Sequence, residues 1–218
     1  MKDKIIIDKI SFSYINHNKE VKVFDKFSLI LNNGEVTFLT GKNGSGKTTL
    51  TKLIMGIIKP TSGSIKLFGS DTSDMNLGQI GQIIGYVFQY PERQLFAPSV
   101  MEQLIFPLTF KGVSKEEAVE KAEEMIKLFQ LTKVRNSYPY FLSYGEKRRL
   151  ALASVLMSNP KYLILDEPTT SLDKERILVL SEVLNSLKAK KIGMLIVSHN
   201  NDFIKSHGDR IIELGGDL

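Results

Sequence analysis

Residues 41–48 carry the pattern G-x-x-x-x-G-K-[ST], which is the pattern of a phosphate-binding loop. Glycines let such a loop approach a phosphate closely, and successive backbone N–H groups then surround the anion. A helix that follows the loop adds its unpaired amides and the positive end of its dipole. In this chemistry Lys47 reaches the β- and γ-phosphates and the Thr48 hydroxyl binds Mg²⁺. The residues that we expect to bind the nucleotide here are Gly41, Asn43, Gly44, Ser45, Gly46, Lys47, Thr48 and Thr49.

The flanks of this phosphate loop (residues 41–48) supply the context that the motif requires. Residues 35–40 are rich in β-formers, and residues 49–55 place apolar side chains at helical spacing. The alternative is a glycine-rich turn that binds nothing. Because strand, loop, Lys-Thr pair and helix all occur in register, we favour the phosphate site.

A second group of chemically capable residues ends two buried strands. Residues 162–165 are apolar throughout and are followed by Asp166 and Glu167, a costly pair unless it binds metal or does chemistry. In a nucleotide site the first acid completes the Mg²⁺ shell with Thr48, and the second polarises the attacking water as general base. His199 follows the apolar run 193–198 and can hydrogen-bond the γ-phosphate, with a purely structural histidine as the alternative.

Four further residues have two interpretations each. Ser143 and Gly145 directly precede an expected helix, so they form either a second anion site or an ordinary N-cap. Asp173, in the segment 171–173, opens the next helix and has the same two interpretations. Tyr14 at a strand end can stack on a nucleobase, or it can be a residue of high β-propensity and nothing more.

The bulk composition describes an ordinary folded chain of 218 residues with 42% hydrophobic and 24% charged residues. No apolar run is long enough for a membrane span, and no secretory signal is present, so we expect a cytosolic protein that reaches the membrane through a partner. The absence of cysteine excludes disulfides and thiolate metal sites. The net charge of +5 is spread among acids and does not by itself indicate nucleic acid.

The elements that must position these residues alternate between strands and helices. Expected strands are 5–14, 27–31, 35–40, 64–69, 83–88, 162–166, 193–198 and 210–214. Expected helices are 49–55, 99–108, 114–131 and 147–157, the third opening with a capping box at 114–117. Residues 15–20 are expected to be a loop, residues 70–83 a short helix with loops, and residues 59–63 the end of the first helix. The chain thus predicts an α/β core with an inserted helical lobe.

Taken in order, the phosphate loop, Gln89, and the segments 142–146, 165–167 and 171–173 with His199 resemble the ATP-binding subunit of an ATP-binding-cassette (ABC) transporter over essentially the whole chain. The resemblance implies one ABC ATPase domain over 1–218. Its P-loop NTPase core, residues 1–90 and 160–218, would have a mostly parallel sheet and an N-terminal antiparallel β part. Residues 91–159 would form the α-helical lobe. ATP and Mg²⁺ would be the ligands.

The same resemblance implies a head-to-tail dimer with two ATP molecules at the interface. Each ATP is held by one chain's phosphate loop and the other chain's signature segment (residues 142–146). Ser143, Gly145, Glu146 and Asp173 would then serve the partner's nucleotide, and Tyr14 would stack on adenine. The implied Mg²⁺ ligands are Thr48, Gln89 and Asp166, and the implied catalytic residues are Lys47, Glu167 and His199.

A narrower resemblance follows Gln89. Residues 88–96, 99–100 and 106–107 are similar to ATPases of energy-coupling-factor importers, which take up vitamins or transition-metal ions. That family implies a transmembrane coupling subunit docked near Gln89–Pro107, a substrate-binding membrane subunit, and a peripheral position on the cytoplasmic face of the membrane. Leu95, Phe96 and Phe106 suit a docking groove, though they would suit a core equally.

Four residues depart from the family pattern. Tyr144 stands where glycine is usual, Glu146 where glutamine is usual, Tyr90 where the subfamily has Asn, and Gln103 where an acid is common. The bulk of Tyr144 beside a phosphate-contact loop would weaken the composite site that this chain completes for its partner. We therefore expect an asymmetric heterodimer with a sister ATPase that carries a standard signature.

Three rival functions were weighed. DNA-repair and chromosome-maintenance ATPases place a long coiled coil between loop and signature, and this chain has no sustained heptads there, so no nucleic-acid partner is expected. The ATPase of another importer or an exporter differs only in the segment after Gln89. A non-catalytic regulatory module would have no need of Glu167 and His199 beside a γ-phosphate.

Overall fold

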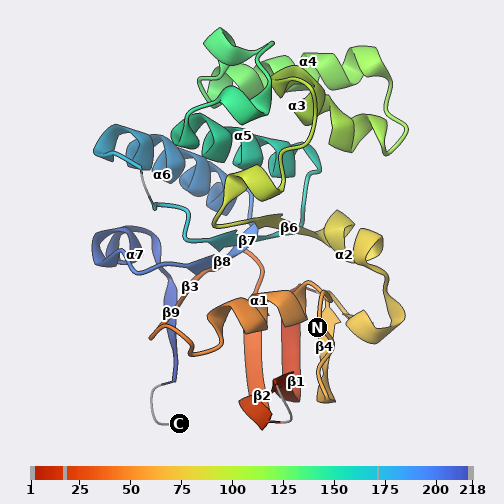
Figure 1. The fold of residues 1–218 in the computed structure, drawn as a ribbon, viewed down its shortest axis with the longest axis vertical. Coiled ribbons are helices and arrows are strands. Elements are labelled where there is room, and N and C mark those ends of the chain that lie inside the picture. The colour runs from red at the N-terminus through yellow and green to blue at the C-terminus, as the bar shows by residue number, and fades with distance from the viewer. Residues whose placement is uncertain (1–2, 17–18, 171, 216–218) are drawn as a thin grey trace.

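Two β-sheets face each other across one helix in the computed structural model, which describes residues 3–16, 19–170 and 172–215 (Figure 1). The antiparallel sheet has the order β2 (Lys19–Asn32), β1 (Lys4–Asn16), β4 (Ser62–Leu67) and β5 (Ser70–Asp71). The parallel sheet has the order β6 (Ile84–Val87), β7 (Tyr162–Asp166), β8 (Gly193–Val197), β3 (Val36–Gly41) and β9 (Arg210–Leu214). Helix α1 (Lys47–Ile54) lies between them. The predicted α/β class, with its antiparallel part and parallel core, is confirmed.

The central strands β7 and β8 of the parallel sheet are buried on both faces, which explains why they are almost continuously apolar. Successive side chains alternate, so Ile164 and Leu195 join α1 and the antiparallel sheet in one core cluster. Leu163, Leu165 and Ile196 point the other way, into a second cluster made with the helices. Strands β3, β6, β7 and β8 therefore belong to both cores, whereas the edge strand β9 contributes Ile212 and Leu214 to the first cluster alone.

The helices gather on the side of the parallel sheet away from α1 (Figure 1). They are α3 (Val100–Thr109), α4 (Lys115–Leu128), α5 (Tyr144–Met157) and α6 (Lys174–Ala189), with the 3₁₀ turns η2 (Pro91–Arg93), η3 (Thr132–Val134) and η4 (Pro139–Phe141) between them. The shorter segments elsewhere are η1 (Thr72–Asp74), α2 (Leu77–Ile83) and α7 (Asn201–His207). Within the part of the chain that the structure describes, no helix is long and apolar enough to cross a bilayer.

Side-chain caps start these helices where the sequence signals stand. Ser99, Ser114, Ser143 and Asp173 each accept a hydrogen bond from the backbone N–H three residues on. The box is complete at α5, where the Glu146 carboxylate accepts from the Ser143 N–H at 2.8 Å. At α4 the capping box that we predicted is half made, because the Glu117 carboxylate pairs with Lys121 at 2.6 Å instead.

Two predicted boundaries are wrong for physical reasons. Residues 15 and 16 and residues 19 and 20 are strand, not loop, because their backbones pair in the antiparallel ladder of β1 and β2, with Ile15 opposite Glu20 and Asn16 opposite Lys19. Residues 17–18 lie outside the described part. The first helix ends at Ile54, not at residues 59–63, because Gly56 takes φ 67° and its N–H donates to the Leu53 carbonyl.

Candidate nucleotide site

A cleft of about 680 Å³ opens at the carboxyl ends of β3, β7 and β8. Parallel strands place the groups that follow them at one edge of the sheet, which brings distant segments together here. The lining residues are Tyr14, Val21, Val23, Asn43, Gly44, Gly46, Lys47, Thr48, Thr49, Gln89, Asp166, Glu167, Thr170, Val197 and His199. Gly41 and Ser45 belong to the same loop but do not line the cleft. All other residues expected for the chain's own nucleotide lie along it.

The glycines of the phosphate loop have different tasks. Gly41, at φ 135°, packs so closely on β9 that a Cβ would lie 2.3 Å from the Leu214 carbonyl oxygen. Gly46, at φ 98°, caps α1, and a Cβ there would lie 2.9 Å from Val23. Nothing lies within 4 Å of a Cβ built on Gly44, so this side of the loop is open to a ligand.

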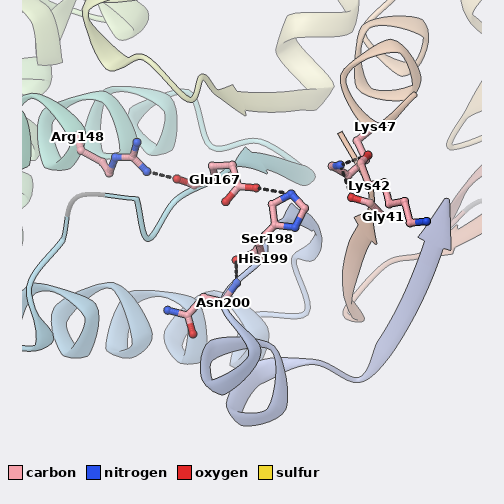
Figure 2. Close-up of polar contacts among 8 residues, drawn as sticks. All are labelled: Gly41, Lys42, Lys47, Arg148, Glu167, Ser198, His199 and Asn200. Carbon is pink, nitrogen blue, oxygen red and sulfur yellow. Dashed lines mark hydrogen bonds and ion pairs between the residues drawn. The ribbon is translucent and has the colours of Figure 1, made fainter. Parts of the chain in front are cut away.

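The Lys47 side chain folds back over the backbone of the phosphate loop. Lys47 Nζ donates to the carbonyls of Gly41 at 2.6 Å and Lys42 at 3.0 Å (Figure 2). The Ser45 hydroxyl oxygen is buried, and within the residues described it has no hydrogen-bond partner. A buried hydroxyl with no partner is costly, and phosphate oxygens are acceptors that such a loop suits.

Thr48, Gln89 and Asp166 supply oxygen donors to one cleft, and a hydroxyl, an amide oxygen and a carboxylate are the ligands that Mg²⁺ prefers. Among the described residues no group of three or more His, Cys, Asp or Glu could hold a metal on its own. The Tyr86 hydroxyl donates to Asp166 Oδ2 at 3.3 Å. Burial raises the pKa of Asp166, while this hydrogen bond and the charges of Lys47 and Arg148 oppose the shift.

Glu167 and His199 meet across the ends of β7 and β8 (Figure 2). Glu167 Oε1 lies 3.5 Å from His199 Nε2, and the Glu167 side chain is only 16% exposed. Burial raises the pKa of Glu167, His199 opposes the shift, and the neighbouring Asp166 adds to it. Glu167 also takes φ 48°, an unusual backbone conformation for a residue with a side chain. Strained residues of this kind concentrate at functional sites.

Arg148 is not among the residues that the sequence analysis singled out. It is only 5% exposed and donates from Nη1 to the Glu167 carbonyl (Figure 2). Its Nη2 donates to the Gln89 carbonyl at 2.7 Å. A signal was available. Arg148 lies four residues after Tyr144 and four before the buried Leu152, so a charge occupies the inward face of a helix.

The signature residues form a separate cluster. Ser143, Gly145 and Glu146 start α5 and Asp173 starts α6, and none of them lines the cleft. The side chain of Arg176 covers Gly145 and pairs with Asp173 at 3.1 Å. Their contact with a nucleotide, which would need a second chain, remains a prediction. Ser171 lies outside the described residues.

Of the two tyrosines expected near a nucleotide, Tyr14 lines the cleft and Tyr144 does not. Tyr14 lines the cleft with a 41% exposed ring, and its hydroxyl is 3.4 Å from Thr49 Oγ1. Tyr144, expected to crowd a phosphate-contact loop, turns inward instead. Its hydroxyl donates to the Gln89 carbonyl at 2.9 Å.

The segment after Gln89 presents an aromatic patch, defined here as Phe96, Phe106 and Phe110, which are 62%, 44% and 80% exposed. The rings of Phe96 and Phe106 meet edge to face, with centroids 4.9 Å apart. Leu95, by contrast, packs against the core. Gln103 is buried, and its Oε1 accepts from the N–H groups of Phe96 and Ala97, so the amide orders the loop that carries Phe96.

Comparison with known sequences gives one family. Residues 24–170 match the family model of the ABC transporter. A putative ABC transporter ATP-binding protein of Bacillus cereus is 37% identical over 213 residues, which cover 98% of this chain and 37% of the relative, so the chain spans little more than a third of that protein. The lipoprotein-releasing system ATP-binding protein LolD of Buchnera aphidicola is 36% identical over 212 residues, covering 94% of this chain and 92% of LolD.

Solved structures of ABC proteins have the same fold as this chain. The cbiO1 protein of Clostridium perfringens, part of the ABC transporter complex cbiONQ, superposes with a TM-score of 0.84 at 27% identity, covering 98% of this chain and 85% of cbiO1. The ATP-binding cassette MJ0796, solved as a dimer in a post-hydrolysis state with ADP and Pi, superposes with a TM-score of 0.87 at 27% identity, covering 96% of this chain and 94% of that one.

Proposed function

The chain belongs to the ABC transporter family of ATP-binding proteins, and from that premise we propose that it hydrolyses ATP to drive a membrane transporter. The observation that carries the proposal is the meeting of Lys47, Asp166, Glu167 and His199 in one cleft beside an open phosphate loop. A module that only bound nucleotide would not need a half-buried carboxylate paired with a histidine there.

The chemistry we propose is in-line attack of water on the γ-phosphorus, which breaks its bond to the bridging oxygen and releases ADP and phosphate, achieved by positioning and electrostatics. Glu167 accepts a proton from the attacking water and His199 hydrogen-bonds the γ-phosphate. Lys47 exchanges its bonds to the Gly41 and Lys42 carbonyls for phosphate oxygens as ATP enters. Thr48, Gln89 and Asp166 would hold Mg²⁺, which when bound would neutralise charge on the phosphates. Tyr14 offers its exposed ring to adenine.

The working unit we propose is an ATP-sandwich dimer. The separation of Ser143, Gly145, Glu146 and Asp173 from the cleft supports a role toward the nucleotide of a second chain. The dimeric state of MJ0796 supports the same arrangement. Because Glu146 departs from the usual signature, we propose that the second chain is a sister ATPase; Tyr144 turns inward and gives this proposal no support.

The transporter we propose is an energy-coupling-factor importer, on the cytoplasmic face of the membrane. The aromatic patch and the likeness to cbiO1 support it. In this machine a transmembrane coupling subunit docks near Gln89–Pro107, and a substrate-binding membrane subunit selects the vitamin or transition-metal ion. The LolD relative supports a second candidate, the ATPase of an ABC transporter of another type.

The catalytic part of the proposal is tested with Glu167→Gln and Lys47→Ala. Glu167→Gln should keep Mg²⁺-dependent ATP binding and lower turnover about 100-fold or more, because the base is lost. Lys47→Ala should weaken ATP binding itself. Glu120→Gln, an exposed change on α4, is the matched control and should leave both unchanged. Full turnover by Glu167→Gln would remove Glu167 from the mechanism.

The partner part is tested by pulling down the tagged chain from a membrane extract of its own cell and identifying the retained proteins by mass. A sister ATPase together with one integral coupling protein supports the importer. A two-domain permease, or a homodimer alone, would assign the same chemistry to a different machine.

A further inference from the structure

A buried ring of polar contacts joins the start of α5 to the two catalytic loops. We propose that Tyr144 and Arg148 are positioning residues that hold the backbones of Gln89 and Glu167 in the geometry needed for water attack. This inference rests on the proposed function, because it takes Glu167 as the base. It assigns Tyr144 a supporting role in the chain's own site, the opposite of the loss expected from its bulk.

The geometry of the ring is closed. Tyr144 and Arg148 are four residues apart on α5 and therefore lie on one face. Arg148 Nη2 donates to the Tyr144 hydroxyl at 2.8 Å and to the Gln89 carbonyl at 2.7 Å, and the Tyr144 hydroxyl donates to that same carbonyl at 2.9 Å. The guanidinium also lies over the Tyr144 ring, 5.2 Å from its centroid. The tyrosine thus fixes the arginine by a hydrogen bond and by a cation–π contact.

The other arm of Arg148 reaches Glu167. Nη1 donates to the Glu167 carbonyl, which also accepts from the Thr170 N–H at 3.2 Å (Figure 2). Glu167 needs such support because its φ of 48° is unfavourable without contacts that hold it. One planar guanidinium therefore sets the distance between the backbones of Gln89 and Glu167, whose side chains both face the cleft.

The hydrogen bonds of the buried Arg148 favour one particular placement of its guanidinium. Hydrogen bonds from a charged donor are about twice as strong as neutral ones, and Arg148 makes three of them while 5% exposed. Its Nε is buried without a partner among the described residues, so the guanidinium is held by its two Nη groups. Losing the tyrosine hydroxyl removes one acceptor from a buried charge and one donor from the Gln89 carbonyl.

The test compares Tyr144→Phe, Tyr144→Gly and Arg148→Lys with wild type in the ATPase complex isolated through the tagged chain. Each should lower kcat about 10-fold or more with little change in KM for ATP, because a misplaced base costs rate while the phosphate loop still binds. Tyr140→Phe, whose ring is 73% exposed, and Arg135→Lys, which pairs with Glu123 in the helical lobe, are matched controls and should keep wild-type kcat. A rise in kcat for Tyr144→Gly would overturn the inference, since it is the result expected if bulk at this position only harms.

A second arm needs no activity. Hydrogen exchange of the backbone amides in segments 86–96 and 162–170 should speed up in Tyr144→Phe and Arg148→Lys and stay unchanged in Tyr140→Phe. Unchanged exchange in the first two variants overturns the inference. Absence of ATP hydrolysis by the wild-type complex overturns the proposed function, so the two failures are distinct.

A double variant separates positioning from binding. In a Glu167→Gln background, Tyr144→Phe should lower the residual turnover by a much smaller factor than it lowers wild-type turnover, because the part of its effect that passes through the base is gone and only the part through Gln89 remains. Additive losses would show that Tyr144 acts elsewhere and would also overturn the inference.

Discussion

Asp166 and Glu167 are two adjacent carboxyl groups at the end of a buried strand, and both have a pKa raised above the ordinary values of 3.8 and 4.5, first of all by burial. Between the ordinary and the raised pKa, the native state holds more protons than the unfolded chain. The free energy of unfolding therefore falls as pH rises through that window. The buried carboxylates of Asp166 and Glu167 therefore lower the free energy of unfolding at neutral pH.

This cost predicts that Asp166→Asn and Glu167→Gln unfold at a higher temperature than wild type at pH 7, with the gain shrinking as pH falls toward 4. In a chain of this size, 1 kcal/mol corresponds to about 2–4 °C in Tm. Thermal unfolding of the nucleotide-free protein between pH 4 and 8 measures it. An unchanged or lower Tm at pH 7 for both variants would contradict the prediction.

Asp209 is the matched control, because its pKa is shifted downward and not upward. Burial acts to raise its pKa, but bonds from Lys188 and the Val36 N–H hold the pKa below 3.8. Its contribution to stability is present above 3.8 and is lost as pH falls through the lowered pKa. Asp209→Asn should therefore lower Tm at pH 7, and the loss should fade on acidification.

At the scale of the element, α4 and α5 offer a matched pair, since both span 14 residues and both are capped by a serine. Ser114→Ala and Ser143→Ala should each lower the free energy of unfolding by about 1 kcal/mol. If Ser143 also contacts the nucleotide of a second chain, only Ser143→Ala should weaken ATP-dependent dimerisation. Urea unfolding measures the first effect. Light scattering of the Glu167→Gln protein with Mg-ATP measures the second. Equal dimerisation by both variants would leave Ser143 as a cap alone.

The sequence predicted elements well where a local signal and a burial pattern coincide. The strand Arg210–Leu214 and the cap at Asp173 are as predicted, because alternation and capping chemistry are local. The hairpin around residues 15–20 was missed, since its polar residues become strand only through pairing partners.

The candidate site divides in the same way. Lys47 and Glu167 could be found from their motif and strand, because the residues next to them in the sequence indicate their chemistry. Arg148 could not be assigned, since its partners, the Gln89 and Glu167 carbonyls, are backbone atoms 59 and 19 residues away. Tyr144 was misjudged for the same reason. A side chain's direction depends on what it can bond to.

At the scale of the whole molecule, the aromatic patch predicts the docking face. Phe96→Ser with Phe106→Ser should abolish co-purification of the coupling subunit and leave the Tm and basal ATP hydrolysis unchanged, because both rings are exposed in the isolated chain. Tyr138→Ser with Phe141→Ser, a second exposed aromatic pair, is the control and should retain the subunit. Retention by the Phe96/Phe106 variant would move the docking face elsewhere.

Strand β3, which leads into the phosphate loop, lies between β8 and β9. The N–H of its first residue, Val36, donates to the carboxylate of Asp209, which lies 173 positions later. The hairpin of β1 and β2, by contrast, pairs neighbours in sequence. Contacts between distant residues require a long loop to close, and the entropy of that closure is lost before the contact stabilises the chain. Folding should therefore proceed from that hairpin, and the central sheet should close last. On a translating ribosome the strand before the phosphate loop would stay unpaired until β8 emerges, and half-paired until β9 follows, so we expect the nascent chain to need chaperones while the helical lobe is synthesised.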